Sequence, residues 1–388
     1  MLESTYMGFP ESWLKKLYGW WETGDGILVH HGDADGVTSA YLLYRAFSKF
    51  LGKKFSMVRA VGSLDYHLPF LKEFEDRFSF YLITDIDIGD SLEVVKSLSP
   101  DKKVFVYDHH KISFEPQSLP ENIFYCNARM LRGTDWHPAS YFAYVFYRYL
   151  EEGDGSKLDP NALWVVALGL AGDMALYEYP ELEEQVRSEY PRLFEGSPTA
   201  LERIVARINA SFSHITSHPS HLAFTLIEKA WEMGDPMYFL EGEDETVKTL
   251  QERRKEYHDI IKRAVRLMPE RAIVELGYPV VHILVEAPYV INGPLASAMT
   301  QEWRDKIALA GQKFGEIVGV EIRRGDRVDV DLADILHSLR NRGFPFISAG
   351  GHPMAAGASL ESKYWKSFIK YFKQEALIKA KIKGNSSV

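Results

Sequence analysis

The feature that most constrains the fold is a series of short apolar runs, each followed by acidic or imidazole side chains. Residues 26–30, 78–83 and 103–107 are such runs, and the stretches between them include segments with helical spacing. Short buried strands that alternate with helices are typical of a parallel α/β sheet. The sequence therefore predicts a parallel sheet in the first third of the chain.

The remaining segments predict a second α/β region after a helical one. Apolar residues recur at helical intervals over 36–50, and the segment 181–265 is charged and mostly helical. Within it, residues 241–263 are typical of an exposed connector helix. Further helices are expected at 138–150, 161–171, 294–304 and 331–342, further strands at 271–275, 280–285, 306–310 and 315–322, and a glycine-rich loop at 349–357.

Length and this order of elements indicate two domains. The chain has 388 residues, and globular domains usually have ~100–200. We expect an α/β domain over residues 1–190, a helical connector over 191–265 and a smaller α/β domain over 266–388.

Composition narrows the classes of function. The 54 acidic and 45 basic residues give a net charge of −9, which excludes a general nucleic-acid coater. A nucleic-acid role then requires a local basic groove or bound cations. The one cysteine, Cys126, excludes an intramolecular disulfide and argues against a cysteine-based zinc site. With no apolar run near the ~18 residues of a spanning helix and no signal-like start, we expect a soluble, cytoplasmic protein.

The side chains after the apolar runs have the chemistry of metal ligands. In parallel α/β sheets, ligands collect beyond the carboxyl ends of the strands, so these side chains should meet at one edge. Oxygen and imidazole donors suit Mn²⁺ or Mg²⁺ better than thiophilic metals. A single aspartate after a strand is usually a helix cap, but several such segments, two of them with histidine, favour a metal centre. The candidates are His31, Asp33, Asp35, Asp85, His109 and Asp173, with Asp108 and His110 adjacent.

The order of these residues resembles a known family. The segment His31-Gly32-Asp33-Ala34-Asp35-Gly36, then Asp85, then Asp108-His109-His110, then Asp173 is similar to the four motifs of the DHH phosphoesterase superfamily. Residues 350–357, Gly-Gly-His-Pro-Met-Ala-Ala-Gly, resemble the GGH motif of the associated DHHA1 domain. The resemblance covers about residues 26–372 and is greatest to archaeal RecJ-like exonucleases. It implies a parallel-sheet DHH domain, a helical connector and a smaller DHHA1 domain, with the active site in the interdomain cleft.

The resemblance also implies a role for each position. One cation would be held by His31 and Asp33, a second by Asp35, His109 and Asp173, and Asp85 would bridge both. Asp108 and His110 would be catalytic residues that orient ligands or contact the phosphate. Gly350, Gly351 and His352 would bind substrate, with glycine amides and the imidazole meeting a phosphate.

Two positions stay open at the sequence level. Asp87 follows Asp85 closely and is an alternative for the bridging carboxylate. His30 precedes His31, and on an alternating strand the two side chains face opposite ways. The spacing to Asp33 and Asp35 favours His31.

The implied function is a Mn-dependent phosphodiesterase that shortens single-stranded DNA or RNA from an end by two-metal hydroxide attack, with Mg²⁺ or Co²⁺ as substitutes. The expected partner is single-stranded nucleic acid or an oligonucleotide. Binding to a membrane is not expected. A homo-oligomer and a replication or repair protein partner stay open. The lysines at 363, 366, 370 and 373 are either soluble surface or the rim of a substrate groove.

Two alternatives remain. The first is a small-substrate phosphodiesterase: a nanoRNase, a 3′-phosphoadenosine 5′-phosphate phosphatase or a cyclic dinucleotide hydrolase. The acidic net charge favours it, since long polymers prefer a basic track. The second is a non-catalytic replication-factor paralogue, which the retained ligand residues disfavour.

Overall fold

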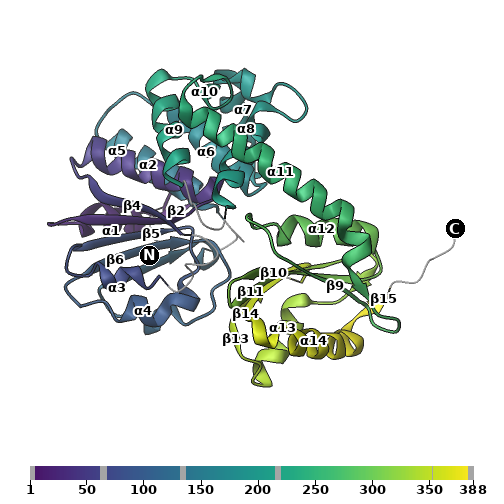
Figure 1. The fold of residues 1–388 in the computed structure, drawn as a ribbon. Helices are drawn as coiled ribbons and strands as arrows, with labels where there is room; N and C mark the ends of the chain where they lie inside the picture. The colour runs from purple at the N-terminus through teal and green to yellow at the C-terminus, as the bar shows by residue number, and fades with distance from the viewer. Residues whose placement is uncertain (1–4, 62–67, 132–136, 215–219, 352, 383–388) are drawn as a thin grey trace. The chain divides into compact units, whose positions relative to one another are not determined.

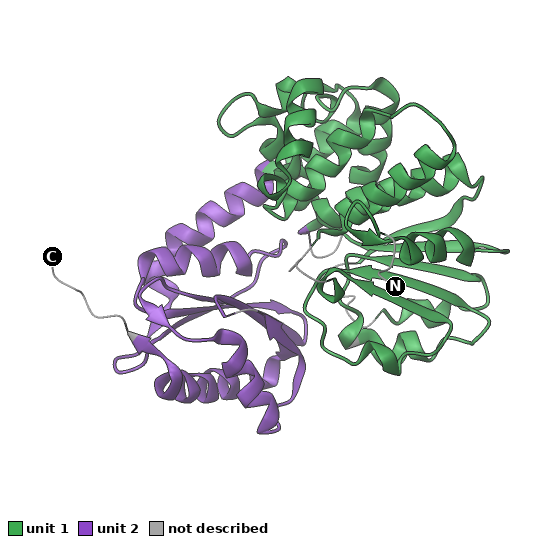
Figure 2. Ribbon diagram, turned by 180° about the vertical axis from the view of Figure 1, so that it is seen from behind, with its two compact units in different colours: residues 1–212, 218–254 green, residues 213–217, 255–388 purple. Residues whose placement is uncertain are grey.

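The structure is a computed structural model that describes residues 5–61, 68–131, 137–214, 220–351 and 353–382 (Figure 1). The chain forms two compact units, shown in Figure 2: unit 1 contains residues 1–212 and 218–254, and unit 2 contains residues 213–217 and 255–388. The division lies within α11 (Glu245–Arg271). Residues 191–212 and 218–254, expected as part of a separate connector, belong to unit 1, and their apolar side chains join its core.

Unit 1 is built on a five-stranded, fully parallel sheet with the order β4-β3-β5-β6-β7, which confirms the predicted class. The three strands expected from the sequence lie in its centre. The outer strands, β4 and β7, were not predicted, because β4 is a half-buried edge strand with a weak apolar pattern and β7 has only five residues. The strands are β3 (Gly26–His31), β4 (Phe55–Val61), β5 (Phe80–Thr84), β6 (Lys103–Asp108) and β7 (Ile123–Asn127).

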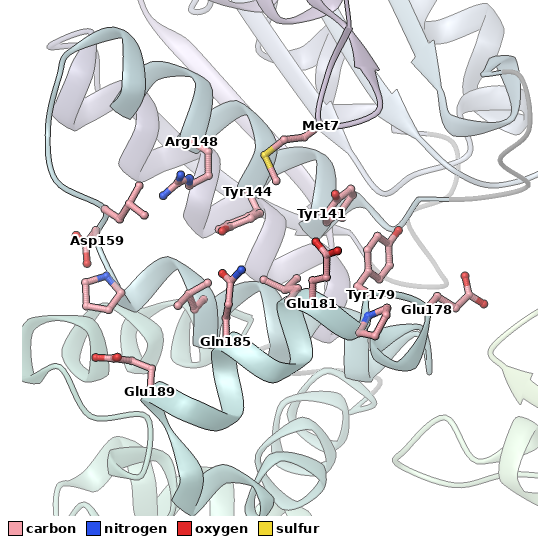
Figure 3. A pocket seen from close by; sticks show the side chains of 15 residues that line it. Met7, Tyr141, Tyr144, Arg148, Asp159, Glu178, Tyr179, Glu181, Gln185 and Glu189 are labelled. Carbon is pink, nitrogen blue, oxygen red and sulfur yellow. The ribbon is translucent and has the colours of Figure 1, made fainter.

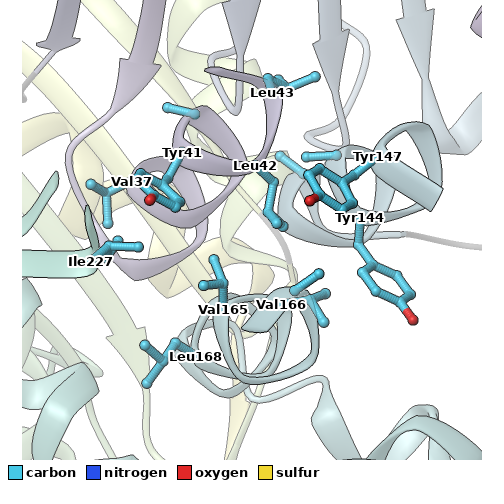
Figure 4. Close-up of a cluster of buried hydrophobic side chains, with 14 of the residues drawn as sticks. Val37, Tyr41, Leu42, Leu43, Tyr144, Tyr147, Val165, Val166, Leu168 and Ile227 are labelled. Carbon is cyan, nitrogen blue, oxygen red and sulfur yellow. The ribbon is translucent and has the colours of Figure 1, made fainter. Parts of the chain in front are cut away.

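Helices cover both faces of this sheet. Alternate residues of a strand serve the two faces, so Leu82 packs in the core of α2, α5 and α6, whereas Ile83 packs in the core that includes α3 and α4. Figure 4 shows the larger core, in which Leu42 of α2 lies near Val166 of α6 and Tyr147 of α5. The helices of the two faces are α1 (Glu11–Trp20), α2 (Ala34–Phe50), α3 (Phe70–Glu73), α4 (Leu92–Lys96), α5 (Ala139–Gly153) and α6 (Asn161–Gly172).

The rest of unit 1 extends the core on the α2 side. The short strands β1 (Thr5–Tyr6) and β2 (Phe9–Pro10) form a hairpin at the start of the described chain. The later helices bury apolar side chains in the same core as α2 and α6. They are α7 (Pro180–Glu189), α8 (Ala200–Phe212), α9 (Ser220–Met233) and α10 (Tyr238–Glu241).

Unit 2 contains a mixed six-stranded sheet with the order β13-β14-β11-β10-β9-β8, in which only β9 and β10 pair in parallel. The helices α13 and α14 share a core with one face, and α12 with the end of α11 shares a core with the other. The elements are β8 (Ile273–Val274), β9 (Val280–Val285), α12 (Asn292–Glu302), β10 (Ile307–Phe314), β11 (Ile317–Arg324), β12 (Val328–Asp329), α13 (Leu332–Asn341), β13 (Phe346–Gly351), β14 (Ala355–Glu361), α14 (Trp365–Lys379) and β15 (Lys381–Ile382).

The glycine-rich segment corrects one expectation, because most of it is strand rather than loop. Strands β13 and β14 pair in antiparallel register, with Gly350 opposite Gly357 and Gly351 opposite Ala356. Gly351 has a φ of 139°, and a Cβ there would lie 2.4 Å from the Cα of Ala356, so this position requires glycine. These strands were not expected from the sequence, because their many small residues give no clear alternation of apolar and polar side chains. His352 lies outside the described residues.

The lysines of the C-terminal helix need a second correction. Lys373 was expected to be exposed, either on the soluble surface or at the rim of a substrate groove. Its side chain is instead buried and pairs with Glu275. Lys363, which precedes α14, lies 2.6 Å from a carboxylate oxygen of Glu361. Throughout the described ranges, the helices are too short or too polar to cross a membrane.

Candidate metal centre

The turn from β3 into α2 carries the first three candidate ligands. Asp33 is the N-cap of α2, and its Oδ1 accepts a hydrogen bond from the amide of Gly36 at 3.0 Å. Its other oxygen, Oδ2, lies 2.9 Å from Nδ1 of His31. A Cβ on Gly36 would lie 2.1 Å from the carbonyl oxygen of His31, so the turn is closed only with glycine. Capping the helix therefore leaves one carboxylate oxygen of Asp33 beside the imidazole.

Asp85 follows β5 directly and occupies the middle of the group. Its backbone is in the left-handed region, with a φ of 60°, and its amide donates to the carbonyl oxygen of Tyr107 at 3.0 Å. The buried carboxylate places Oδ1 3.0 Å from Nε2 of His109 and Oδ2 3.8 Å from Nδ1 of His31. Asp87, the open alternative, instead caps the short helix that follows by accepting from the amide of Gly89 at 2.8 Å.

The end of β6 supplies two histidines with different surroundings. His109 is buried, and its Nε2 lies 3.5 Å from Oδ2 of Asp173 and 4.0 Å from Oδ2 of Asp35. His110 is half-exposed, and its Nδ1 lies 2.7 Å from Oδ1 of the buried Asp108. Asp108 thus orients His110 and is not one of the grouped ligands.

Asp35 is held by the N-terminus of α5. Its Oδ2 accepts from the amide of Ala139 at 2.7 Å, and its Oδ1 accepts from the amide of Ser140 at 3.0 Å and from the Ser140 hydroxyl. Donors at a helix start stabilise a carboxylate and fix its orientation. The sequence carries no signal for Ser140, because the contact joins segments far apart in the chain.

The described ligand atoms fall into three groups whose members lie within 4.8 Å of one another. One group joins His31 and Asp33 to Asp85, and the second joins Asp35, His109 and Asp173. The third links Asp85 and His109 with His110, so Asp85 connects the first group to the histidine of the second. The structure brings together all of the predicted ligands. His30 is in none of these groups: it is buried, with Nδ1 2.6 Å from the carbonyl oxygen of His31.

The electrostatics of the centre fit divalent cations. Oδ2 of Asp85 and Oδ2 of Asp173 are buried with no hydrogen-bond partner in the described part of the chain. Burial and the neighbouring carboxylates raise the pKa of Asp173 to about 9, that of Asp35 to about 6, and that of Asp85 well above its usual range. Buried carboxylates without a counter-charge are unfavourable, and a divalent cation supplies that charge. The oxygen and imidazole donors suit Mn²⁺ or Mg²⁺.

His110 supplies a positive charge at the edge of the centre. Although burial opposes protonation, the neighbouring Asp108 carboxylate raises the pKa of His110 to about 9. The Asp108 carboxylate therefore favours the protonated form of this imidazole. Asn127 was not predicted, yet its Nδ2 donates to the carbonyl oxygen of His110 at 3.0 Å and holds this segment.

A separate cavity of about 800 Å³ lies elsewhere in unit 1, between α5 and α7 (Figure 3). Its walls include Tyr141, Arg148 and Tyr179, and none of the candidate ligands lines it. The chemistry of the side chains, rather than the size of a cavity, identifies the candidate site.

The sequence matches no protein-family model and no curated protein. Solved structures with a similar fold include an exonuclease RecJ bound to manganese, at 17% identity and a TM-score of 0.68, covering 96% of this chain and 95% of that one. RecJ from Thermus thermophilus in complex with Mn²⁺ is 18% identical, with a TM-score of 0.66. The match covers 96% of this chain and 55% of that one, so the chain spans about half of that protein.

A third structure bears the family name. It is the DHH domain of a member of the s1p family of ribosomal proteins, at 17% identity and a TM-score of 0.64, covering 96% of this chain and 90% of that one. At such identities the likeness concerns the fold. The chain therefore has the α/β fold of the RecJ and DHH-domain structures, which agrees with the fold class expected from the sequence.

Proposed function

We propose that the chain is a divalent-cation-dependent phosphodiesterase that shortens single-stranded DNA or RNA from an end. The observation that carries the proposal is the position of Asp85 between two ligand groups, with one carboxylate oxygen 3.8 Å from Nδ1 of His31 and the other 3.0 Å from Nε2 of His109. Pairs of cations joined in this way are typical of enzymes that cleave phosphodiester bonds. The solved RecJ structure bound to manganese, which has the same fold, supports it.

Each residue has a distinct role in this proposal. His31 and Asp33 would hold one cation, Asp35, His109 and Asp173 would hold the other, and Asp85 would contact both. Bound cations supply the Lewis acidity that activates water and offsets phosphate charge. Mn²⁺ is the preferred ion, with Mg²⁺ or Co²⁺ as substitutes.

The residues around the ligands act on the substrate. The His110 imidazolium, held by Asp108, donates to a phosphoryl oxygen on which charge develops. Gly350, Gly351 and His352 of the GGH segment bind a phosphate, which stays a prediction, since His352 lies outside the described residues.

A small-substrate phosphodiesterase is the second candidate, and charge favours it. The chain carries a net charge of −9, and long nucleic acids prefer a basic track. Lys373 is buried against Glu275, so α14 offers a polymer one lysine fewer than the sequence suggested. A nanoRNase, a 3′-phosphoadenosine 5′-phosphate phosphatase or a cyclic dinucleotide hydrolase would fit this charge.

The deciding experiment compares substrates with the same protein. Metal-free protein reconstituted with Mn²⁺ is given a linear single-stranded 20-mer, a single-stranded circle, a 2-mer and a cyclic dinucleotide. Asp85→Asn serves as the inactive control. We expect the linear 20-mer to be shortened and the circle to stay intact.

The other outcomes are equally informative. Rapid cleavage of the circle would contradict an exonuclease, and preference for 2-mers or the cyclic dinucleotide would select the small-substrate alternative. Hydrolysis of none of these substrates by Mn²⁺-loaded protein would favour the non-catalytic paralogue.

A further inference from the structure

Arg129 lies in the turn after β7 and contacts the segment that carries the proposed ligand His109. Its Nε donates a hydrogen bond to the carbonyl oxygen of His109 at 3.1 Å, and the residue is otherwise exposed. One edge of the guanidinium is thus fixed at the metal centre. Its remaining N–H groups make no other hydrogen bond to the described part of the chain.

Within the residues that the structure describes, the guanidinium of Arg129 has no acidic partner. In the described ranges no carboxylate lies within ion-pair distance of its guanidinium, although several carboxylates surround the neighbouring His109. Other arginines of this acidic chain do have acidic partners, among them Arg148, Arg187, Arg192, Arg304, Arg323, Arg324 and Arg342. The carboxylates of the centre are instead engaged by imidazoles and backbone amides.

Asn127 fixes the position of Arg129 relative to the ligands. The buried Asn127 accepts from the backbone amide of Arg129 at 2.9 Å through Oδ1. Through Nδ2 it donates to the carbonyl oxygen of His110 at 3.0 Å. The Asn127 side chain therefore links the turn that carries Arg129 to the segment that carries His109 and His110, in addition to the contact of Arg129 itself.

A fixed guanidinium beside a cation site has a specific chemical use. The planar fork of arginine matches two oxygens of a phosphate group and stays charged at any working pH. A phosphate held by cations at Asp85 and His109 would lie near His109, to whose carbonyl oxygen the guanidinium is anchored. A group held in place before the substrate arrives loses little freedom on binding.

We propose that Arg129 binds a non-bridging oxygen of the substrate phosphate at the metal centre and is a catalytic residue. The inference rests on the proposed phosphodiesterase function. It adds that recognition of the phosphate begins within unit 1, through a side chain outside the DHH motifs.

The test compares Arg129→Ala and Arg129→Lys with a matched control, Arg77→Ala. Arg77 is exposed and lies just before β5, at the sheet edge opposite to the metal centre. Loss of one preorganised donor usually lowers kcat by 10²–10³-fold, so we expect Arg129→Ala to lower kcat/KM by roughly 100-fold. Arg129→Lys should recover part of this loss, because it restores charge without the fork. Arg77→Ala should behave like the wild type.

A second measurement separates substrate contact from mere support of His109. Mn²⁺ affinity is measured by calorimetry for the wild type and both Arg129 variants, and inorganic phosphate is then titrated into each Mn²⁺-loaded protein. We expect an unchanged affinity for Mn²⁺ and a phosphate affinity at least tenfold weaker in Arg129→Ala.

Three results would overturn the inference. A loss of Mn²⁺ affinity equal to the loss of activity would make Arg129 a support for His109. If Arg129→Ala binds phosphate as tightly as the wild type does, Arg129 does not contact the phosphate. A wild-type kcat/KM in this variant would contradict the contact as well. If the wild type hydrolyses no phosphodiester, the proposed function fails, whereas the phosphate titration still decides the role of Arg129.

Discussion

The metal centre of unit 1 presents side chains, whereas the glycine hairpin of unit 2 presents backbone. In unit 1, the carboxyl ends of β3, β5 and β6 deliver buried carboxylates and imidazoles that contact one another. In unit 2, Gly350 and Gly351 end a strand, and only Gly351 is required by the local backbone. The difference teaches that a core fixes the carboxylates and imidazoles of unit 1, whereas the hairpin of unit 2 leaves a glycine at an exposed strand end.

The largest expected effect is on activity, from Asp85→Asn in the metal centre. Because Asp85 contacts both ligand groups, the variant should lose more than about 10³-fold in kcat, or about 4 kcal/mol of transition-state stabilisation. Single-turnover hydrolysis of the linear 20-mer measures it. Asparagine suits the left-handed backbone at this position, where alanine would add strain.

The same variant has a second, opposite effect on stability. The pKa of Asp85 is raised in the folded chain, so its ionisation opposes folding above the pKa of the unfolded chain. The metal-free variant should therefore unfold at a higher temperature than the metal-free wild type at pH 7, with the gain fading as the pH falls toward about 4. A lower melting temperature at pH 7 would contradict the electrostatic account of the centre.

Adding Mn²⁺ should stabilise unit 1 and leave unit 2 unchanged. A cation at 100 times its Kd stabilises the state that binds it by about 2.7 kcal/mol. Hydrogen exchange with and without Mn²⁺ should show protection in β3, β5, β6 and α2 but none in β13 and β14. Equal protection of both units would break the comparison between them.

In the hairpin, Gly351→Ala should cost stability and Gly350→Ala should not. A Cβ at Gly351 meets the backbone of Ala356 at a φ of 139°, which should cost about 1–3 kcal/mol. A Cβ at Gly350 meets open space. Urea unfolding measures both, with Mn²⁺ affinity as the control that neither variant should change. A raised KM in the stable Gly350→Ala variant would then report on substrate contact.

The smallest expected effect is on affinity, from Ser140→Ala at the start of α5. The variant removes the hydroxyl that donates to Asp35 and should weaken Mn²⁺ binding by about tenfold. This is the lower end of the range for residues that hydrogen-bond to a metal ligand. Ser211→Ala is the matched control, because the Ser211 hydroxyl is buried but donates only to the carbonyl oxygen of Ile208 within α8. Unchanged affinity in Ser140→Ala would mean that the amides of α5 suffice to hold Asp35.

The sequence predicts the centre of unit 1 well, for a physical reason. Strands such as β5 are buried on both faces and read as apolar runs, and the groups after them are forced to one edge by the parallel arrangement. Asp85 rather than Asp87, and His31 rather than His30, follow from where the strands end. The positions were thus accessible from order and spacing alone.

The remainder depends on contacts that spacing does not encode. Ser140 and Asn127 act through hydrogen bonds to distant segments, and Lys373 is buried by a partner in another element. The hairpin of β13 and β14 consists largely of small residues, whose strand character comes from pairing with β11 rather than from their own pattern. The helices after α6 looked like a connector because their exposed faces are charged, while their apolar faces complete the core of unit 1.

The left-handed backbone at Asp85 also limits how this site can change in descent. Glycine and asparagine are the residues that adopt this conformation at least cost. Each is reached from an aspartate codon by a single base change, and either removes the shared carboxylate without disturbing the turn. Under the proposed function, a lineage therefore loses hydrolysis in one mutational step and keeps a folded chain. In such a lineage, Asn or Gly at this position would mark a protein retained for binding rather than for cleavage.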